Sequence, residues 1–365
     1  MIKTKALILA GGFATRLRPL SCTRPKTLFP ILNKPLLQWT FERLVTHEIS
    51  EAILAVNHQT EALIKEEKIP RKGLLVKYSR DPARKPLGTA GPTKKAEQQL
   101  GHYNPFFVLN GDIYADVNYT RMLKQHEEQE ALVTIALHRA EDPKRYGVVE
   151  LSDDNRITKF VEKPAQNAFA SNLINAGVYV LDPKIFEYIP KNKPVSMERE
   201  IFPKLATEGL LYGFIHEGSW FDIGEPEDYL KINRNLLDSS TDIKQARSRN
   251  KEIIKNPVAL DKGVHIGQKS IIGPYAVLGQ NVRIGKKAQI RNSIILPETV
   301  VSDSATIDGA IIGVNVFIGK NVTINKGCIL GDHTKIDNNV TLAENVSVCP
   351  AKEIHEDVKT TQNVC

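Results

Sequence analysis

The sequence predicts two folded parts: an α/β domain with a mostly parallel sheet over residues 1–240, and a left-handed parallel β-helix of hexapeptide repeats over residues 257–350. Apolar runs of strand length alternate with segments of helical character in the first part, as in α/β domains. A six-residue apolar repeat, which is typical of a parallel β-helix, takes over in the second. The 365 residues suffice for two domains, and 41% hydrophobic with 25% charged residues is ordinary globular usage.

The first apolar run, residues 5–10 (KALILA), predicts a buried parallel strand that leads directly into Gly11 and Gly12. Further strands are expected at 52–56, 74–78, 106–109, 132–137 and 177–181, and helices at 35–48, 93–100 and 119–130. In a sheet of this kind the ligand site lies at the carboxyl ends of the strands. The motifs that follow these strands are therefore the candidates for chemistry.

The hexapeptide repeat begins near Pro257, runs regularly over residues 264–285 and resumes over 310–348. Each unit is expected to supply one short strand, with three units to a coil. The spacing slips between the two runs, where Pro297 and Asp303 predict a wider turn. Residues 351–365 are expected to form a C-terminal tail.

The connector at 241–256 is predicted to be a basic linker or helix. The formal net charge of the chain is +7, and residues 242–255 alone contain five basic and two acidic side chains. This stretch is too sparse for a nucleic-acid or membrane patch, so neither is expected as a partner. No run approaches the roughly 18 apolar residues of a membrane span, and the N-terminal apolar stretch is too short for a signal peptide. A cytoplasmic location is the resulting expectation.

The four cysteines, Cys22, Cys328, Cys349 and Cys365, show neither a CxxC motif nor the spacing of metal ligands. They are expected to be buried or incidental thiols, without a disulfide framework or a zinc site.

A glycine-rich loop follows the first strand, at residues 11–20 (GGFATRLRPL) and 23–26 (TRPK). The two glycines let the backbone approach a ligand and direct its N–H groups at phosphate oxygens. Thr15 adds a hydroxyl, and Arg16 and Lys26 add positive charge. No GK[ST] closes the loop as in a P-loop, and the GxGxxG of dinucleotide sites is absent. A phosphate-binding loop of another kind is predicted.

Two carboxylates are the candidate metal ligands. Asp112 ends the strand motif 109–112 (LNGD), and Asp222 lies in 220–224 (WFDIG). An aspartate at a strand end is often only a turn former. Two carboxylates together with phosphate oxygens suit Mg²⁺, which favours hard oxygen ligands and keeps several waters. Asp112 and Asp222 are therefore the predicted Mg²⁺ pair.

The loop string resembles the GGxGTRLxPLTxxxPKxxxP signature of the sugar-1-phosphate nucleotidylyltransferases, also called nucleoside-diphosphate-sugar pyrophosphorylases. It departs at Ala14, where the family commonly has glycine; a methyl group fits there if the local φ is negative. The resemblance extends in motif order over the first 240 residues and implies a Rossmann-like nucleotidyltransferase domain. The motifs, among them 196–203 (SMEREIFP), most resemble those of mannose-1-phosphate guanylyltransferases (GDP-mannose pyrophosphorylases).

The resemblance implies roles for individual residues. Arg16 contacts the phosphates of the nucleotide, Lys26 lies near the reacting phosphate, Glu162 contacts sugar hydroxyls and Lys163 holds the sugar phosphate. The implied nucleotide-binding residues are Ala10, Gly11, Gly12, Thr15, Arg16, Lys26, Pro86, Leu87, Gly88, Thr89, Ala90, Asn110 and Gly111. The implied sugar-phosphate-binding residues are Tyr146, Gly147, Glu162, Lys163 and Asn175. The implied catalytic residues are Arg16, Lys26, Asp112, Lys163 and Asp222, with Mg²⁺ on Asp112 and Asp222. The motif at 86–91 (PLGTAG), placed against the nucleobase in the family, also suits a helix cap.

The implied reaction joins a sugar 1-phosphate oxygen to the α-phosphorus of a nucleoside triphosphate and releases pyrophosphate, a transfer of class EC 2.7.7. GTP and mannose 1-phosphate, giving GDP-mannose, are favoured, because thymidylyl- and uridylyl-transferring relatives usually carry Lys-Gln where this chain has Lys26-Thr27. A UTP- or dTTP-dependent glucose-1-phosphate enzyme is the competing activity.

The β-helix is expected to join copies of the chain into a homo-oligomer. Two competing hypotheses stay open: an acetyltransferase with His265 or His333 as its base, and a non-catalytic regulatory homologue of the enzymes.

Overall fold

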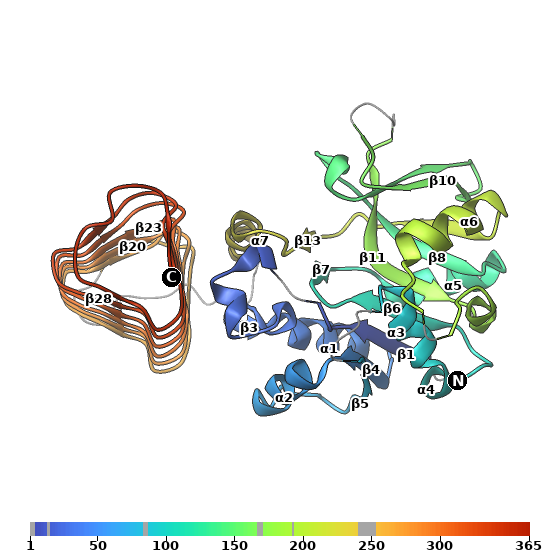
Figure 1. Cartoon of the computed structure of the whole chain (residues 1–365), viewed down its shortest axis with the longest axis horizontal. Helices are drawn as coiled ribbons and strands as arrows, with labels where there is room; N and C mark the ends of the chain where they lie inside the picture. The colour runs from blue at the N-terminus through green and yellow to red at the C-terminus, as the bar shows by residue number, and fades with distance from the viewer. Residues whose placement is uncertain (1–3, 13–14, 83–86, 166–170, 192, 240–252) are drawn as a thin grey trace. The chain divides into compact units, whose positions relative to one another are not determined.

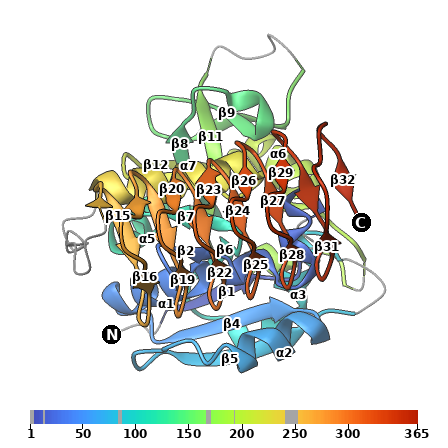
Figure 2. The same cartoon turned by 90° about the vertical axis from the view of Figure 1, so that its left-hand side faces the viewer.

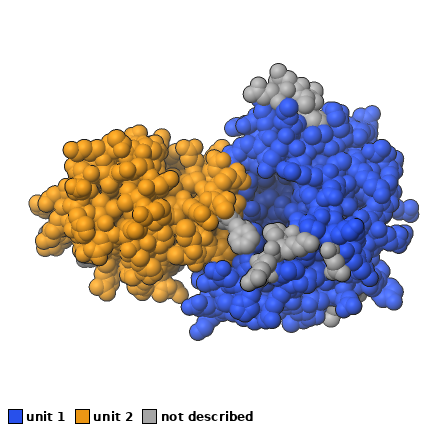
Figure 3. All heavy atoms as spheres, in the orientation of Figure 1, with its two compact units in different colours: residues 1–12, 36–222 blue, residues 13–35, 223–365 orange. Residues whose placement is uncertain are grey.

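The computed structural model describes residues 4–12, 15–82, 87–165, 171–191, 193–239 and 253–365 (Figure 1). By its internal contacts the chain divides into two compact units, coloured separately in Figure 3. The first unit comprises Met1–Gly12 and Leu36–Asp222, and the second comprises Phe13–Pro35 and Ile223–Cys365. The segment that follows the glycine pair therefore packs with the C-terminal part of the chain.

The first unit is built on a mixed sheet with the strand order β10-β9-β11-β6-β1-β4-β5. Strand β8 also pairs with β11, and β12 pairs with β8. Strand β1 (Lys5–Leu9) pairs in parallel with β4 (Glu51–Val56) and β6 (Phe106–Asn110), and β4 pairs in parallel with β5 (Leu75–Arg80). The other strands are β8 (Val133–Arg139), β9 (Gly147–Leu151), β10 (Ile157–Glu162), β11 (Leu173–Leu181) and β12 (Leu211–Ile215). The parallel core expected from the apolar runs is confirmed, as is the Rossmann-like domain that the resemblance implies.

Six α-helices are described in the first unit. They are α1 (Leu36–Thr46), α2 (His58–Glu66), α3 (Ala90–Lys95), α4 (Glu97–Leu100), α5 (Tyr119–Glu128) and α6 (Phe202–Thr207). The single helix expected at 93–100 is instead two, divided at Ala96, and it begins earlier, at Ala90. Pro92 is tolerated there because the first turn of a helix needs no N–H at that position. Within the described ranges, no helix is both long and apolar enough to cross a bilayer.

Short elements complete the connections. Two are two-stranded ladders, β2 (Pro30–Ile31) with β3 (Lys34–Pro35) and β7 (Ile113–Ala115) with β13 (Trp220–Asp222). The others are the 3₁₀ turns Thr15–Leu17, Leu20–Cys22, Lys26–Leu28, Pro143–Arg145 and Pro183–Glu187 and the π turn Met197–Ile201. A longer helix, α7 (Pro226–Ser239), follows β13. Helix α7 belongs to the second unit and packs there on residues 30–32. Tyr229 donates a hydrogen bond to the Pro30 carbonyl at 2.6 Å, and Asn233 accepts one from the Leu32 amide at 2.9 Å.

The rest of the second unit is a β-helix whose coils stack in three parallel sheets (Figure 2). The first sheet is β14 (Ile253–Ile254), β17 (Ile271–Ile272), β20 (Gln289–Arg291), β23 (Thr306–Asp308), β26 (Thr323–Ile324) and β29 (Thr341–Leu342). The second is β15 (Val258–Leu260), β18 (Ala276–Leu278), β21 (Ile294–Ile295), β24 (Ile311–Ile312), β27 (Ile329–Leu330), β30 (Ser347–Val348) and β32 (Asn363–Val364). The third is β16 (His265–Ile266), β19 (Arg283–Ile284), β22 (Val300–Val301), β25 (Phe317–Ile318), β28 (Lys335–Ile336) and β31 (Glu353–Ile354). The predicted left-handed β-helix is confirmed.

The wider turn predicted around Pro297 and Asp303 is wrong, because the core residues Ile295, Val301 and Ile307 keep the six-residue step there. The spacing slips because two corners on either side, at Asn292 and Gly309, are shortened instead. Ile290 and Ile295, which both point into the core, are five residues apart rather than six. Asn292 turns this tight corner in the left-handed region, with φ of 51°. Asparagine adopts that region more readily than most residues, so a single residue suffices for the corner.

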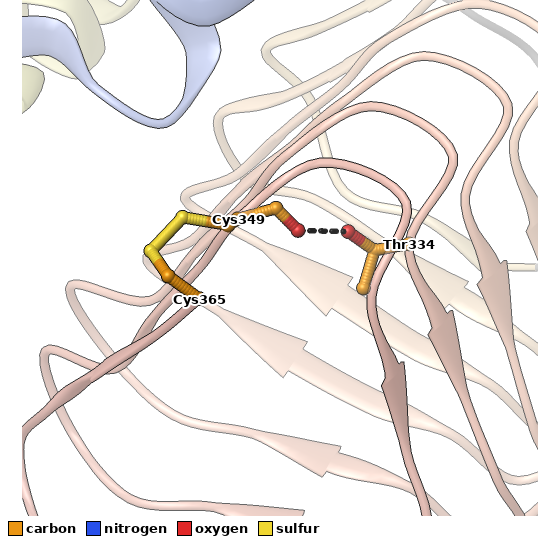
Figure 4. The surroundings of a disulfide bond; sticks show 3 residues. All are labelled: Thr334, Cys349 and Cys365. Atoms are coloured by element: carbon orange, nitrogen blue, oxygen red, sulfur yellow. Dashed lines mark hydrogen bonds between the residues drawn. A yellow bond between two sulfur atoms is a disulfide. The ribbon is translucent and has the colours of Figure 1, made fainter.

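The interpretation of all four cysteines as unpaired thiols is also wrong. Cys349 and Cys365 form a disulfide across a sequence separation of 16 (Figure 4), whereas Cys22 and Cys328 are free. The disulfide fixes β32 beside β30, so residues 351–365, expected to be a tail, continue the stack of coils. No spacing rule pointed to this pair, because the two cysteines are brought together by one turn of the coil rather than by a short motif.

Removing this disulfide is expected to release the last strand without unfolding the coils beneath it. A disulfide that closes a loop of this length stabilises the folded state by about 3 kcal/mol. Without it, the equilibrium constant for opening of the last strand should be roughly 100-fold larger. In Cys365→Ser the amides of Ser347 and Cys349, which donate to Gln362 and Val364, should exchange hydrogen faster.

Hydrogen exchange followed by mass spectrometry measures this, with Cys22→Ser as the control for loss of a thiol. Equal protection of β30 in both variants would show that the disulfide does not hold the last strand.

Candidate active site

The two predicted metal ligands lie at the same end of one short ladder. Strand β7 pairs antiparallel with β13, and in this register Asp222 lies opposite Ile113, the residue after Asp112. The turn at Asp112 is held against the sheet because the Gly111 amide donates to the Leu9 carbonyl at 3.0 Å. Both carboxylates are half-buried. Two residues far apart in sequence are thus neighbours across the ladder.

The two carboxylates fit a Mg²⁺ ion that takes its other ligands from water and substrate. In the part of the chain that the structure describes, no three His, Cys, Asp or Glu side chains gather closely enough to hold a metal by themselves. Mg²⁺ is commonly bound by one or two carboxylates with the remaining positions taken by waters and substrate phosphates. Asp112 and Asp222 are suited to hold such an ion once a phosphate supplies further oxygens.

The residues predicted to bind the sugar phosphate come together on the hairpin of β9 and β10. Gly147 lies opposite Glu162, and the Lys163 amide donates to the Tyr146 carbonyl at 3.0 Å. A Cβ at Gly147 would lie 2.6 Å from Phe160 Cζ and 3.0 Å from Glu162 Oε2. Only glycine leaves room there for the Glu162 carboxylate.

Asn175, on β11, completes this group from the centre of the sheet. Its Nδ2 donates to the Tyr179 hydroxyl at 3.0 Å, and its Oδ1 accepts from the Gly177 amide at 2.9 Å. Gly177 has φ of 70°, and a Cβ there would lie 2.8 Å from Asn110 Nδ2. Asn175 and Asn110, which were predicted to bind different substrates, both make a side-chain hydrogen bond with Tyr179.

An aromatic group links this face to the metal ligands. Trp220, two residues before Asp222, donates through Nε1 to the Ala176 carbonyl at 3.0 Å. The Tyr146 and Trp220 rings pack edge to face with their centroids 5.1 Å apart, and the His138 ring stacks on Trp220 with a centroid distance of 5.4 Å. The indole therefore ties strand β13, with Asp222, to the predicted sugar-binding residues.

The motif predicted to contact the nucleobase is bonded to the segment around Val195. Ala90 donates to the Val195 carbonyl and Val195 to the Leu87 carbonyl, each at 3.0 Å. Gly88 has φ of 72°, and a Cβ there would lie 2.2 Å from the Val195 oxygen, so no side chain fits. Pro86, also predicted to bind the nucleotide, lies outside the described residues.

Glu198 connects the nucleobase motif to the sugar-binding group. Its Oε2 accepts hydrogen bonds from Thr89 at 2.6 Å and from Ser196 at 2.8 Å. Burial raises the pKa of Glu162, and the Glu198 carboxylate raises it further, against the opposing charges of Lys163 and Arg199. Glu198 has no role of its own in the family motifs quoted above and was not predicted. The pattern that could have indicated it is Ser196 followed by glutamates at 198 and 200, just before an apolar run.

The glycine pair follows β1 in the first unit. Ala10 donates to the Ala55 carbonyl at 2.9 Å, whereas a Cβ at Gly12 would meet nothing within 4 Å. Gly11 faces Asp81, whose Oδ2 would lie 3.5 Å from a Cβ there. The other oxygen, Oδ1, is buried without a partner among the described residues, and burial raises the pKa of Asp81. Asp81 was not predicted, because an aspartate before proline is an ordinary turn signal.

The remainder of the phosphate loop lies in the second unit. Arg16 is half-exposed and its Nη1 lies 3.6 Å from Glu225 Oε1. Lys26 opens the 3₁₀ turn Lys26–Leu28, and its carbonyl accepts from the Phe29 amide at 2.9 Å. Thr15 starts the turn Thr15–Leu17. Ala14, where the signature departs from the family, lies outside the described residues.

The structure thus gathers the predicted residues into two groups. The carboxylates, the sugar-binding residues and the nucleobase motif form one arrangement within the first unit. Thr15, Arg16 and Lys26 lie within the second unit and are joined to the glycine pair through the chain.

Two family models together match nearly the whole chain. The model described as "Nucleotidyl transferase" matches residues 5–239, and the model described as "GMPPB C-terminal domain" matches residues 254–364.

Curated relatives match over almost their full lengths. The chain is 34% identical over 357 residues to "Mannose-1-phosphate guanylyltransferase 1" of Arabidopsis thaliana, and 36% identical over 356 residues to "Mannose-1-phosphate guanylyltransferase catalytic subunit beta" of Danio rerio. Each alignment covers 97% of this chain and 98% of the relative.

Among solved structures, HddC from Yersinia pseudotuberculosis is similar, with a TM-score of 0.55 and 30% identity over 64% of this chain and 99% of that one. The same protein complexed with GMP-PN gives the same values. A putative glucose-1-phosphate thymidylyltransferase from Bacillus anthracis has a TM-score of 0.59 at 23% identity over 66% of this chain and 98% of that one, a likeness of fold alone.

Proposed function

The chain belongs to the nucleotidyl transferase family, and we propose that it transfers the guanylyl group of GTP to mannose 1-phosphate, giving GDP-mannose and pyrophosphate. The observation that carries this proposal is the similarity to mannose-1-phosphate guanylyltransferases along both units, at 34% to 36% identity over 97% of the chain. The GMP-PN complex of the Yersinia protein supports a guanine nucleotide as the donor.

The reaction needs alignment and charge neutralisation more than covalent help from the protein. An oxygen of mannose 1-phosphate forms a bond to the α-phosphorus of GTP, and the bond from that phosphorus to the bridging oxygen of the β-phosphate breaks. Pyrophosphate leaves with the electron pair. No general base is required, because the sugar phosphate is already ionised near neutral pH.

Asp112 and Asp222 are the residues suited to hold Mg²⁺, which when bound supplies positive charge to the phosphate oxygens. Lys163 is the proposed group that neutralises the incoming sugar phosphate. The hydrogen bond from its amide to Tyr146, beside Glu162, supports this role. Arg16 and Lys26 are the proposed cationic contacts of the triphosphate. Divalent metal use and these individual roles are proposals that rest on the donor set and the family.

Glu162 and Asn175 are the proposed recognition groups for the sugar. An ionised carboxylate accepts hydrogen bonds from sugar hydroxyls, and the Asn175 amide is held ready by Tyr179 and Gly177. The half-buried position of Glu162 strengthens such hydrogen bonds by excluding water.

No observation favours an acetyltransferase or a regulatory homologue. His265 and His333, the predicted candidates for an acetyltransferase base, are both exposed, and His333 Nδ1 lies 3.0 Å from Asn315 Nδ2. Assembly of copies through the β-helix stays a prediction. So does the cytoplasmic location, and the Cys349–Cys365 disulfide is of a kind more common in oxidising compartments.

Pyrophosphate release tests the proposed function directly. The protein is incubated with Mg²⁺, mannose 1-phosphate and each of GTP, UTP, dTTP, CTP and ATP. GTP is expected to give the highest kcat/KM. Preferential turnover of glucose 1-phosphate with UTP or dTTP would establish the competing activity. No pyrophosphate release with any pair of nucleotide and sugar phosphate would contradict the assignment as an enzyme.

The raised pKa of Glu162 predicts a specific pH dependence. Glu162 accepts hydrogen bonds from sugar hydroxyls through both oxygens, with a full negative charge, only when it is ionised, and it becomes protonated as the pH falls through its pKa. Because burial and Glu198 raise that pKa, the loss begins at a higher pH than for an ordinary glutamate. Below it, KM for mannose 1-phosphate should rise by up to about tenfold per pH unit.

The measurement is the ratio of wild-type to Glu162→Gln kcat/KM for mannose 1-phosphate across pH, which removes the titration of the substrate. The ratio should fall toward one in acid. The matched control, Glu150→Gln, replaces a half-exposed glutamate on the neighbouring strand. A ratio for Glu162→Gln that does not change with pH would remove Glu162 from sugar recognition.

A further inference from the structure

A carboxylate of the β-helix is bonded to the phosphate loop. Asp332 lies in a corner between β27 and β28, and its Oδ2 accepts hydrogen bonds from Thr23 Oγ1 at 2.6 Å and from Arg24 Nη2 at 2.7 Å. The side chains of Asp332 and Arg24 are only 5% and 17% exposed. Lys26, the predicted contact of the reacting phosphate, follows Arg24 by two residues.

Asp332 is itself rigidly held. Its Oδ1 accepts from the Val314 amide at 2.8 Å, and its carbonyl accepts from the Ala351 amide at 2.8 Å. A Cβ at Gly313 would lie 2.6 Å from this Oδ1, so the glycine makes room for the carboxylate. The coils below and above Asp332 thus fix it in place, and its second oxygen points to the loop.

Two other corners show which part of this arrangement is ordinary β-helix structure. Asp303 Oδ1 accepts from the Lys286 amide and Asn338 Oδ1 from the Lys320 amide, each at 2.7 Å. All three side chains therefore cap a corner amide of the preceding coil. Within the described ranges, Asp332 alone of the three also bonds residues of the loop segment 15–35. Capping needs one oxygen, as Asn338 demonstrates, and the second oxygen of Asp332 serves another purpose.

We propose that Asp332 is a positioning residue for nucleotidyl transfer, which holds Thr23 and Arg24 so that the following turn presents Lys26 to the triphosphate. The role of Lys26 rests on the proposed function, whereas the restraint on the loop does not. A hydrogen bond between charged groups stabilises more than a neutral one, and a buried charge left alone is costly. The β-helix thereby contributes to the catalytic loop and is more than a scaffold.

The test uses Asp332→Asn in the full chain. An asparagine retains an oxygen for the Val314 amide, as Asn338 does at its own corner, but it presents an N–H group to Arg24 in place of the second oxygen. Asp303→Asn is the matched control, since it makes the same chemical change at a corner for which the described structure shows no loop contact. Arg24→Gln interrupts the same contact from the loop side and leaves the β-helix untouched if Asp332→Asn fails to fold.

The first readout is hydrogen exchange, which needs no substrate. The amides of Leu28 and Phe29 donate to the carbonyls of Pro25 and Lys26 and report the order of the turn. They should exchange faster in Asp332→Asn and Arg24→Gln and be unchanged in Asp303→Asn. Equal protection in Asp332→Asn and Asp303→Asn would overturn the inference.

The second readout is kinetic. Asp332→Asn should lower kcat/KM for GTP by about tenfold or more, with the KM for mannose 1-phosphate unchanged. The double variant with Arg24→Gln should be no worse than Asp332→Asn, because one contact is already lost. Additive losses would contradict a shared contact. Inactivity of the wild type with every substrate would count against the proposed function, and the exchange experiment would still decide the inference.

Discussion

The pairing of β7 with β13 is the interaction on which the site depends. Asp112 and Asp222 cannot both serve one ion unless this antiparallel ladder holds its register, since each extra residue of slip would turn one side chain to the opposite face. The ladder is fixed at one end by the Gly111 amide on the last residue of β1, and at the other by the Trp220 indole on Ala176. In the proposed mechanism the divalent ion is therefore positioned by this backbone pairing rather than by a broad basic field.

The division of the chain into two units adds a second constraint. The loop segment 15–35 packs in one unit with helix α7 and the β-helix, through the Tyr229 and Asn233 hydrogen bonds and the Arg24–Asp332 ion pair. The half of the phosphate loop that carries Arg16 and Lys26 thus depends on the C-terminal part of the chain for its shape. A β-helix attached only as an oligomerisation module would not need the buried contact between Arg24 and Asp332.

Much of this arrangement could be predicted from the sequence, and what escaped prediction depends on tertiary contact. The strand at 5–10 and the hexapeptide coils could be predicted because the period of their apolar residues matches the pattern of buried side chains. The clustering of Gly147, Glu162 and Asn175 followed from family motifs. Missed were the carboxylates that act on residues far away in sequence, namely Glu198, Asp81 and Asp332. The Cys349–Cys365 pair was mispredicted for the same reason: one turn of a coil, rather than a motif, brings the two thiols together.

Joint binding of the divalent ion by Asp112 and Asp222 is the central claim of the proposed mechanism. A crystal structure of the protein with Mn²⁺ and a non-hydrolysable GTP analogue tests this claim most directly, because the anomalous signal locates the metal. One peak is expected in contact with an oxygen of each carboxylate and of the triphosphate, at about 2.2 Å by analogy with Mg²⁺. A metal bound without either aspartate, in a complex with ordered nucleotide, would contradict the claim.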